Sequence, residues 1–359
     1  MEVYSIEITL ESPLVSTEEQ IGNVLRHSGA YIKGRVIRGA VLNSLYIRDP
    51  NAVKDEVMRP KLIFHPAYPV KDGSVCKPAH PLTFSCKICR KPPRGYDSSP
   101  YKLLKAFESG EFRLPVFCEK GHPLSMSPKG GMLLDGRGEG IELRSLRMES
   151  VGINRFLKSS EMGMLYGYVA LPPGLTFRGL VVDRAGKVRD LEIDGIEEIR
   201  MGRGVSRGMG KASVKIKLME DGLDKEVRRI EDIMNRSGGL VVLRALSHVF
   251  HLKMDSDGLI SLPLPEVRGE GISEVQISPY GSLGGNAIFT KLSEVLGFSS
   301  VSRLPIPRIV GADVGSLFFY RVSMSSLSGA ARYLAEREFL GFGPFSASGL
   351  NVLEVMDYE

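Results

Sequence analysis

The sequence predicts an α+β fold in which two β-α-β-β-α-β units follow one another along the chain. In both halves, strand-like alternation of apolar and polar residues is interleaved with helix-like segments. Both halves also end in the same order, with a helix, a glycine-rich loop and a strand, in EEIRMGRGVSRGMGKASVKIKL and in AEREFLGFGPFSASGLNVLEVM. Each half therefore fits a ferredoxin-like unit whose glycine-rich loop precedes its last strand. Two unrelated α+β domains that both end on a glycine-rich turn are the alternative.

In the first half, alternation at residues 3–10 predicts a strand. The apolar period of residues 34–49 predicts a helix that places Ile37, Ala40, Val41 and Leu45 on one face. A second helix is expected at residues 101–110 and a short one near residues 193–202. Further strands are expected at 146–153, 164–171, 175–183 and 212–219.

In the second half, a charged linking helix at residues 224–235 is followed by segments that alternate between strand and helix character. We expect strands at 239–250, 315–324 and 350–356, and helices at 286–297 and 327–341. The predicted organisation is a first unit at 1–222, interrupted by an insertion at 60–130, then a linking helix at 223–237 and a second unit at 238–359.

The composition is that of a globular chain with two cores, since 43% of the 359 residues are apolar and 25% are charged. The formal charge of +5 permits an anionic partner without requiring one. The N-terminal segment MEVYSIEITLESPL lacks the pattern of a signal peptide, and no stretch approaches the roughly 18 apolar residues of a membrane span. A cytoplasmic location is therefore expected, with no membrane partner.

The proline-rich insertion at residues 60–130 contains all four cysteines. Cys86 and Cys89 form a C-x2-C pair, and Cys118 and His122 form a C-x3-H pair. Tetrahedral Zn²⁺ is bound by two such short segments that converge, and a structural metal would stabilise a region with little regular core. The spacing thus predicts a structural zinc site with four protein ligands and no open position for catalysis.

Two alternatives to this ligand set remain open. Cys76 or His80, in the C-x3-H of CKPAH, would replace His122 as the fourth ligand in the first alternative. In the second alternative, the cysteines are ordinary buried thiols.

The first glycine-rich loop, GRGVSRGMGK at residues 202–211, combines four glycines with Arg203, Arg207 and Lys211. Glycine lets a backbone approach a phosphate closely, and arginine adds charge and forked hydrogen bonds. The loop is neither a P-loop nor a Rossmann loop, because the spacing differs and a strand follows it. A flexible, solvated basic loop is the alternative.

Two other segments are candidates for contact with an anion or a base. Lys33, Arg35 and Arg38 surround the start of the first helix, where the helix dipole favours a phosphate, although a solvated helix start fits equally well. The second glycine-rich loop, residues 341–349, contains Phe342 and Phe345, which could stack on nucleobases if they are exposed. Aromatic residues in such a loop more often anchor it to the core.

The combination of YIKGRVIRGA at the first helix, VGINR, MLYGY and FRG in the central strands, and GRGVSRGMGK before a strand resembles the RAMP superfamily. Its members are the repeat-associated RNA-binding subunits of CRISPR effector complexes, which act in antiviral defence. The resemblance covers most of residues 1–218, and the second half resembles the superfamily mainly through its terminal glycine-rich loop.

A chain with two such units and a cysteine-rich insertion looks most like the subunit that caps type III complexes. Among these complexes, the resemblance is to the type III-D form. The resemblance implies a non-catalytic protein that holds the 5′ tag of the crRNA and contacts the large signalling subunit and the backbone subunits. It implies crRNA contacts at Lys33, Gly34, Arg35, Arg38, Asn154, Arg155, Gly202, Arg203, Gly204, Arg207, Gly208, Gly210 and Lys211.

Two relatives in the same superfamily are the competing interpretations. Backbone subunits cut target RNA with an aspartate in the loop before the first helix, but RHSGAYIKG has no aspartate here. Processing endoribonucleases cut repeat RNA without a metal and often use a histidine near the first helix. His27, with Tyr31 nearby, would take that role.

Overall fold

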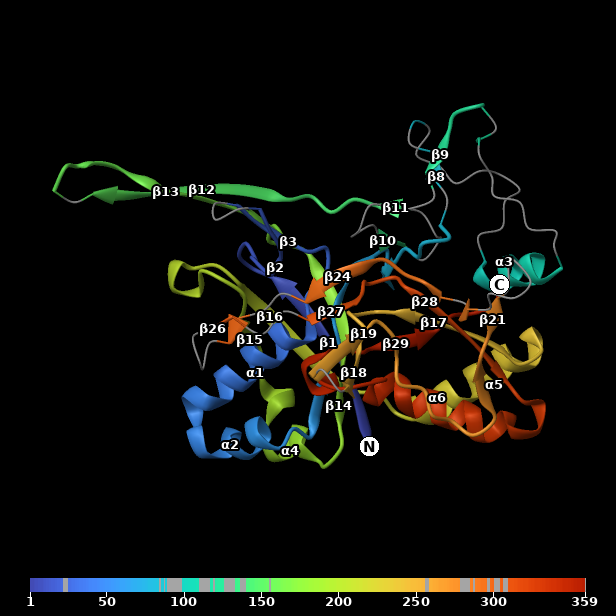
Figure 1. The fold of residues 1–359 in the computed structure, drawn as a ribbon. Coiled ribbons are helices and arrows are strands. Elements are labelled where there is room, and N and C mark those ends of the chain that lie inside the picture. The colour runs from blue at the N-terminus through green and yellow to red at the C-terminus, as the bar shows by residue number, and fades with distance from the viewer. Residues whose placement is uncertain are drawn as a thin grey trace.

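The computed structural model gives a mixed α/β chain with several sheets. The structure describes residues 1–21, 25–83, 85–86, 88, 99–109, 117–118, 120–125, 133–135, 140–154, 156–255, 258–277, 285–286, 288–295, 298–299, 304–305 and 309–358. Two antiparallel sheets form the body, and two extended segments project from it (Figure 1). No helix in these ranges is long and apolar enough to cross a membrane.

The first sheet is built around β1 (Glu2–Leu10), as its alternating sequence predicts. β1 pairs antiparallel with β14 (Thr176–Asp183) and β16 (Lys211–Leu218), and β14 also pairs with β4 (Leu62–Phe64) and β5 (Tyr68–Lys71). Numbered along the chain, the core strands β1, β4, β14 and β16 lie in the spatial order 4-1-3-2. β15 (Glu198–Arg200) extends the sheet beside β16, and β6 (Ser74–Val75) extends it beside β5.

The two faces of this sheet bury different partners. Ile6 and Ile8 face α1 (Gly34–Arg48), whose Ile37 and Val41 are fully buried against them, as the helical period predicts. On the opposite face, Val3, Ile63 and Val182 pack against Phe339 of the second unit. Since β residues alternate between faces, one strand holds its own helix on one side and the second unit on the other.

Two differences from the sequence prediction concern the first unit. Strands β4 and β5 belong to the first sheet, although their residues fall inside the range we assigned to the insertion. The short helix expected near 193–202 is replaced by α4 (Lys187–Asp190), a 3-10 turn at Ile193–Gly195 and β15, because β15 finds a pairing partner in β16. A further helix, α2 (Pro50–Met58), begins at a proline, which is favoured in the first turn.

The second sheet has the same strand order as the first. β17 (Leu240–Ala245) pairs antiparallel with β28 (Leu317–Val322) and with β29 (Leu353–Val355), and β28 also pairs with β20 (Ile272–Glu274) and β23 (Ile288–Phe289). Helices α5 (Gly222–Ser237) and α6 (Leu327–Leu340) pack against each other below it (Figure 1). The predicted strands near 240, 317 and 353 and the helices near 224 and 327 are thus confirmed.

The helix predicted at residues 286–297 is wrong. Ile288 and Phe289 pair with β28, and β24 (Leu292–Val295) pairs with β27 (Ile309–Ala312). The apolar spacing of this segment suits either period, and the open edge of β28 offers hydrogen bonds that the isolated helix lacks. In the described part of the second unit, α5 precedes β17 and no helix lies between β17 and β20.

The insertion is attached to the second unit through α3 (Pro100–Glu108). Tyr101 of α3 is fully buried, donates a hydrogen bond to the carbonyl of Met356 at 2.7 Å and accepts one from the amide of Val242 at 3.3 Å. Leu104 enters the same core. The inserted segment therefore stabilises the edge at which β17 meets β29.

A long hairpin projects from the first unit (Figure 1). It is formed by β12 (Leu146–Asn154) and β13 (Ser159–Ala170), and only its base joins β3 (Leu25–Ser28) and β2 (Thr17–Ile21). At its tip, Phe156 is 97% exposed. The side chain of Asn154 accepts hydrogen bonds from the amides of Phe156 and Leu157 and so closes the turn.

The remaining strands form one small three-stranded sheet and several two-stranded pairs. They are β7 (Lys77–Pro78), β8 (Ser85–Cys86), β9 (Leu124–Ser125), β10 (Leu133–Leu134), β11 (Gly140–Ile141), β18 (His251–Asp255), β19 (Gly258–Leu262), β21 (Gln276–Ile277), β22 (Gly285–Asn286), β25 (Phe298–Ser299) and β26 (Leu304–Pro305).

Candidate nucleic-acid interface

The first glycine-rich loop is folded tightly against the segment Pro13–Thr17. All four of its glycines have a positive φ, between 73° and 82°. A Cβ on Gly202 would lie 2.5 Å from the carbonyl oxygen of Val15, and one on Gly210 would lie 1.8 Å from that of Met201. The amide of Gly210 donates to Pro13, so the glycines here serve backbone geometry first. An anion would therefore be bound mainly by the side chains of the loop and less by its backbone amides.

Arg207 is the most exposed cation of this loop, and two tyrosines hold it. Its guanidinium donates to the hydroxyl of Tyr168 at 2.9 Å and to that of Tyr166 at 3.1 Å. The hydrogen bond to Tyr168 raises the pKa of Arg207, so the side chain stays charged. Both tyrosines lie on β13, at the base of the projecting hairpin.

Arg203 adds a second positive charge beside this group. Burial, followed by the charge of Arg26, lowers the pKa of Arg203. Two guanidinium groups that repel each other in a partly buried position are stabilised when an anion approaches. Arg26 comes from β3, a strand that the sequence analysis did not consider as part of the site.

Three buried polar atoms near these arginines have no hydrogen-bond partner among the described residues. They are the hydroxyl oxygens of Ser16 and Thr17 and the Nε of Arg26. Ser16 is only 2% exposed. Because a buried polar group without a partner costs about 1–3 kcal/mol, these atoms are available to pair with a water or a ligand.

Lys33 joins the same segment from the start of α1. It donates to the carbonyl of Thr17 at 3.2 Å, two residues beyond the Val15 carbonyl that accepts from Arg203. Segment Pro13–Thr17 therefore brings the glycine-rich loop and the first helix start together, as the sequence could not show. Lys33 itself is 7% exposed.

The start of α1 also meets the second glycine-rich loop. A narrow pocket there is lined by Lys33, Arg35, His248 and Ser348. Burial, and then Lys33, lowers the pKa of His248 to about 4, so this histidine is neutral at pH 7. In the loop, Phe342 is fully buried as expected, whereas Phe345 is 54% exposed.

The structure gives three of the predicted RNA contacts a structural role. Arg38 forms an ion pair with the buried carboxylate of Glu56 at 3.1 Å. Lys211 pairs with Glu11 at 2.7 Å and with Glu198 at 3.1 Å. Asn154 closes the hairpin turn, and Arg155 lies outside the described residues.

The predicted metal ligands converge in part. The donor atoms of Cys86, Cys118 and His122 all lie within 4.8 Å of one another, so this group could hold a metal ion. The Sγ of Cys86 is 3.8 Å from the Nδ1 of His122, close to the roughly 3.6 Å that tetrahedral zinc bonds of ~2.3 and ~2.05 Å imply. The turn between Cys118 and His122 contains Gly121 at φ 74°, as its predicted role in that turn requires. Cys89 lies outside the described residues.

The alternative ligands lie elsewhere. Cys76 is fully buried in an apolar cluster with Tyr31, Tyr68 and Leu133. His80 is 4% exposed, and burial, followed by the charge of Arg244, lowers its pKa to about 3. Neither belongs to the described metal-binding group, so the fourth-ligand alternative that replaced His122 is wrong for this structure.

The residues of the nuclease alternative have different environments. Tyr31 is 4% exposed, and its ring stacks on Tyr68 with centroids 5.1 Å apart. His27 is exposed on β3, and its Nδ1 lies 3.0 Å from the carbonyl of Ser28. Tyr31 is thus a core residue, and nothing in the described geometry makes the two a catalytic pair.

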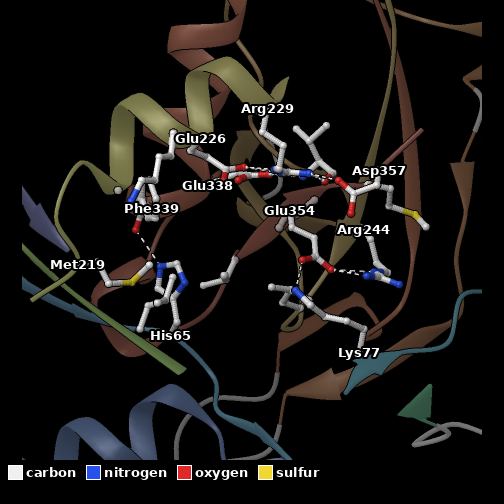
Figure 2. Close-up of a pocket in the computed structure, with 18 of the residues that line it drawn as sticks. His65, Lys77, Met219, Glu226, Arg229, Arg244, Glu338, Phe339, Glu354 and Asp357 are labelled. Carbon is white, nitrogen blue, oxygen red and sulfur yellow. Dashed lines mark hydrogen bonds and ion pairs between the residues drawn. The ribbon is translucent and has the colours of Figure 1, made fainter. Parts of the chain in front are cut away.

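A cavity of about 780 Å³ lies between the first sheet and the second unit, and its charged residues neutralise one another (Figure 2). Glu354 accepts from Lys77 and Arg244. Burial alone would raise the pKa of Glu354, but these two cations lower it to about 2. The ion pairs in this cavity therefore connect the two units.

A second group of charges in this cavity centres on Arg229. Arg229 donates to Glu338 at 3.2 Å and to Asp357 at 2.6 Å, and it also pairs with Glu226. Burial, and then the charge of Glu226, raises the pKa of Glu338 well above its usual value. Helices α5 and α6 and the C-terminal segment are thereby joined (Figure 2).

Sequence reasoning missed Tyr166, Tyr168 and Arg26 as members of the interface. The spacing of the two tyrosines was a signal, because residues i and i+2 of a strand share one face. Nothing in the sequence indicates that the tyrosines lie near Arg207, since Tyr168 and Arg207 are 39 residues apart in the chain.

No protein-family model matches this sequence, and no curated protein matches it either. Among solved structures, a chain of the Type III-B Cmr-beta bound to cognate target RNA and AMPPnP is similar, with a TM-score of 0.44 and 10% identity over 88% of this chain and 86% of that chain. The structure of a Cas6-related gene product from Pyrococcus furiosus has a TM-score of 0.38 and 11% identity over 99% of this chain and 100% of that chain.

A structure described as an RAMP protein binding different RNA substrates gives the same TM-score of 0.38 and 11% identity. The structural neighbours are thus RAMP proteins and subunits of type III-B complexes. All of these TM-scores lie below 0.5.

Proposed function

We propose that this chain is a non-catalytic, RNA-binding subunit of a type III CRISPR effector complex, in the RAMP superfamily. Its sequence motifs resemble that superfamily, and both sheets have the strand order 4-1-3-2 of a ferredoxin-like unit, although no helix lies between β17 and β20 in the described part of the second unit. The observation that carries the proposal is the group formed by Arg26, Arg203 and Arg207 beside Ser16 and Thr17, whose buried hydroxyls have no described partner.

The proposed mechanism is recognition without chemistry. Arg203 and Arg207 bind phosphates of the guide RNA, and the orphaned groups of Ser16 and Thr17 donate to phosphate or ribose oxygens. Lys33 and Arg35 extend this surface toward the second glycine-rich loop. Arg38 and Lys211 are left out of the proposed contacts because carboxylates already engage them.

A salt titration of RNA binding tests the proposal. The purified chain should bind crRNA with an affinity that falls steeply with salt, because each neutralised phosphate releases counterions. Replacing Arg203 and Arg207 with alanine should weaken binding and lower the slope of log K against log salt by about 1–2. Arg332→Ala removes one positive charge from an exposed position of α6 and serves as the control for each single substitution. Unchanged binding in the double variant would move the site elsewhere.

We further propose that the bound segment is the 5′ tag of the crRNA, and that the large signalling subunit and the backbone subunits are partners. Guide RNA with the tag should bind more tightly than the same RNA without it. Equal affinity for both would contradict the tag-holding role and leave general guide binding intact. Cleavage of repeat RNA that is lost in His27→Ala would instead establish the nuclease alternative.

We also propose that the group of Cys86, Cys118 and His122 binds structural zinc, with Cys89 as fourth ligand. The donor set suits zinc, since thiolates and an imidazole at these separations fit a tetrahedral ion. The metal would hold β8 and β9 together. The role is a staple, and four protein ligands leave no position for catalysis.

A further inference from the structure

Tyr166 and Tyr168 hold the side chain of Arg207 in one position, although Arg207 is exposed at the surface. The guanidinium lies 5.6 Å from the ring centroid of Tyr166 and 5.4 Å from that of Tyr168, in addition to its hydrogen bonds with both hydroxyls. The two rings meet edge to face, with centroids 5.8 Å apart. A flexible side chain thus becomes a fixed, flat cation.

The two tyrosines have different surroundings. Tyr168 is 5% exposed and packs with Val15 and Met209, so the core sets its position. Tyr166 is only partly buried at the edge of the same cluster. Tyr168 therefore anchors the arrangement, and Tyr166 lies partly exposed at its edge.

Arg207 keeps hydrogen-bonding capacity for a ligand. A guanidinium has about five N–H groups, and the described partners of Arg207 accept two hydrogen bonds. Arg203, whose backbone is held by Val15, lies in the same loop and supplies a second charge. A ligand with a flat aromatic part and an adjacent anion matches both features.

We infer that Tyr166 stacks on one unpaired nucleobase, whose neighbouring phosphate binds Arg203 and the remaining N–H groups of Arg207, which Tyr168 holds in position. A base in a duplex is already stacked on both faces, so only a single-stranded nucleotide can use the site. Tyr168 acts as a positioning residue for Arg207, and Tyr166 contacts the base. The inference rests on the RNA-binding function proposed above and specifies the kind of RNA that the site takes.

The test compares an RNA of about 20 nucleotides with its duplex, both measured against the full chain by fluorescence anisotropy. Because aromatic stacking of one base is worth about 1–3 kcal/mol, Tyr166→Ala should weaken single-strand binding about tenfold. Affinity for the duplex should stay unchanged. Tyr46→Ala removes a tyrosine that is 56% exposed on α1 and is the matched control.

A double-mutant cycle tests the positioning role of Tyr168. Tyr168→Phe keeps the buried ring and removes only the hydroxyl that accepts from Arg207. It should weaken single-strand binding a few-fold in the wild type and have no further effect in Arg207→Ala. Thermal unfolding of each variant confirms that the fold is kept.

The outcomes separate this inference from the function on which it rests. Equal losses on single-stranded and duplex RNA, or full affinity in Tyr166→Ala, would overturn the stacking site. If Arg203 and Arg207 variants still weakened binding in that case, the RNA-binding function would stand. A wild-type chain that binds no RNA at low salt would overturn both.

Discussion

Gly34, at the start of α1, and Gly349, at the end of the second glycine-rich loop, touch backbone to backbone. A Cβ on Gly34 would lie 2.8 Å from the Cα of Gly349 and 2.0 Å from the carbonyl oxygen of Phe64. Gly349 has a φ of 69°, so it needs glycine for conformation as well as for space. The glycine signals of the two halves of the sequence thus meet at one contact between the two units.

Gly34→Ala should lower the stability of the whole chain. The new methyl group would overlap the backbone of β4 and of the second loop, which cannot move aside as a flexible side chain can. We expect a loss of about 3 kcal/mol or more in the free energy of unfolding, measured by denaturant titration. Gly39→Ala, in the same helix with no atom within 4 Å of the new Cβ, should instead stabilise by about 0.5–1 kcal/mol. Similar effects of the two variants would contradict the contact.

Arg38→Ala should destabilise the fold without weakening RNA binding. Arg38 pairs with Glu56, whose side chain is 1% exposed and also accepts from the amides of Lys61 and Leu62. Removing the cation leaves a buried carboxylate without its charge partner, which costs about 3 kcal/mol. Denaturant unfolding and crRNA affinity are measured on the same preparation. An RNA-binding loss as large as that of Arg203→Ala would return Arg38 to the interface.

Purified protein should contain about one zinc ion per chain, measured by elemental analysis. Cys86→Ser and His122→Ala should each lose the metal and expose the β8–β9 segment to proteolysis, because both side chains belong to the converging group. Cys76→Ala is the control, since Cys76 lies in an apolar cluster away from it. A metal-free wild type with a stably folded insertion would exclude the site.

Stability should fall as the pH drops from about 6.5 to about 4. Burial lowers the pKa of His65 from its usual 6.5 to about 4, and a backbone hydrogen bond to Phe339 offsets this only in part. Below pH 6.5 the unfolded chain therefore binds a proton at His65, whereas the folded chain binds it only near pH 4. The stabilisation is thus present above pH 6.5 and is lost progressively between pH 6.5 and 4. The melting temperature across this range is the measurement.

His65→Gln isolates this effect. The glutamine amide can still donate to the carbonyl of Phe339, which accepts from His65 Nε2 at 2.8 Å, but it does not titrate. The loss of stability between pH 6.5 and 4 should shrink by up to about 3 kcal/mol, while His80 and His248, whose pKa values burial also lowers, keep their contributions. Glu354, whose pKa is lowered to about 2, contributes only at still lower pH. An unchanged pH profile would contradict the burial of neutral His65.

The first unit was largely readable from the sequence because its signals are local. Buried and less buried residues alternate in β1 with period 2, and buried residues repeat in α1 with period 3.6. Each element can therefore be recognised from its own sequence pattern. The helix at 286–297 failed for the opposite reason. Its residues bury only by pairing with β28 and β27, which lie elsewhere in the chain.

The candidate site divides in the same way. Arg203, Arg207 and Lys33 were found from charge beside glycine, and Cys86, Cys118 and His122 from ligand spacing. The sequence did not reveal the ion pair of Arg38 with Glu56. It also did not reveal the hydrogen bonds of Arg207 to Tyr166 and Tyr168, because such contacts depend on where whole elements pack.

By itself the sequence predicted the central strands of both sheets, helices α1, α3, α5 and α6, the glycine-rich loops and the candidate residues for binding a metal or a phosphate. Propensity, periodicity and short spacings act over a few residues, so one chain segment is enough to reveal them. Only the tertiary structure decided that Pro13–Thr17 joins the first loop to α1, and that Gly34 meets Gly349. Those contacts join residues far apart in the chain, and packing of the two sheets fixes them.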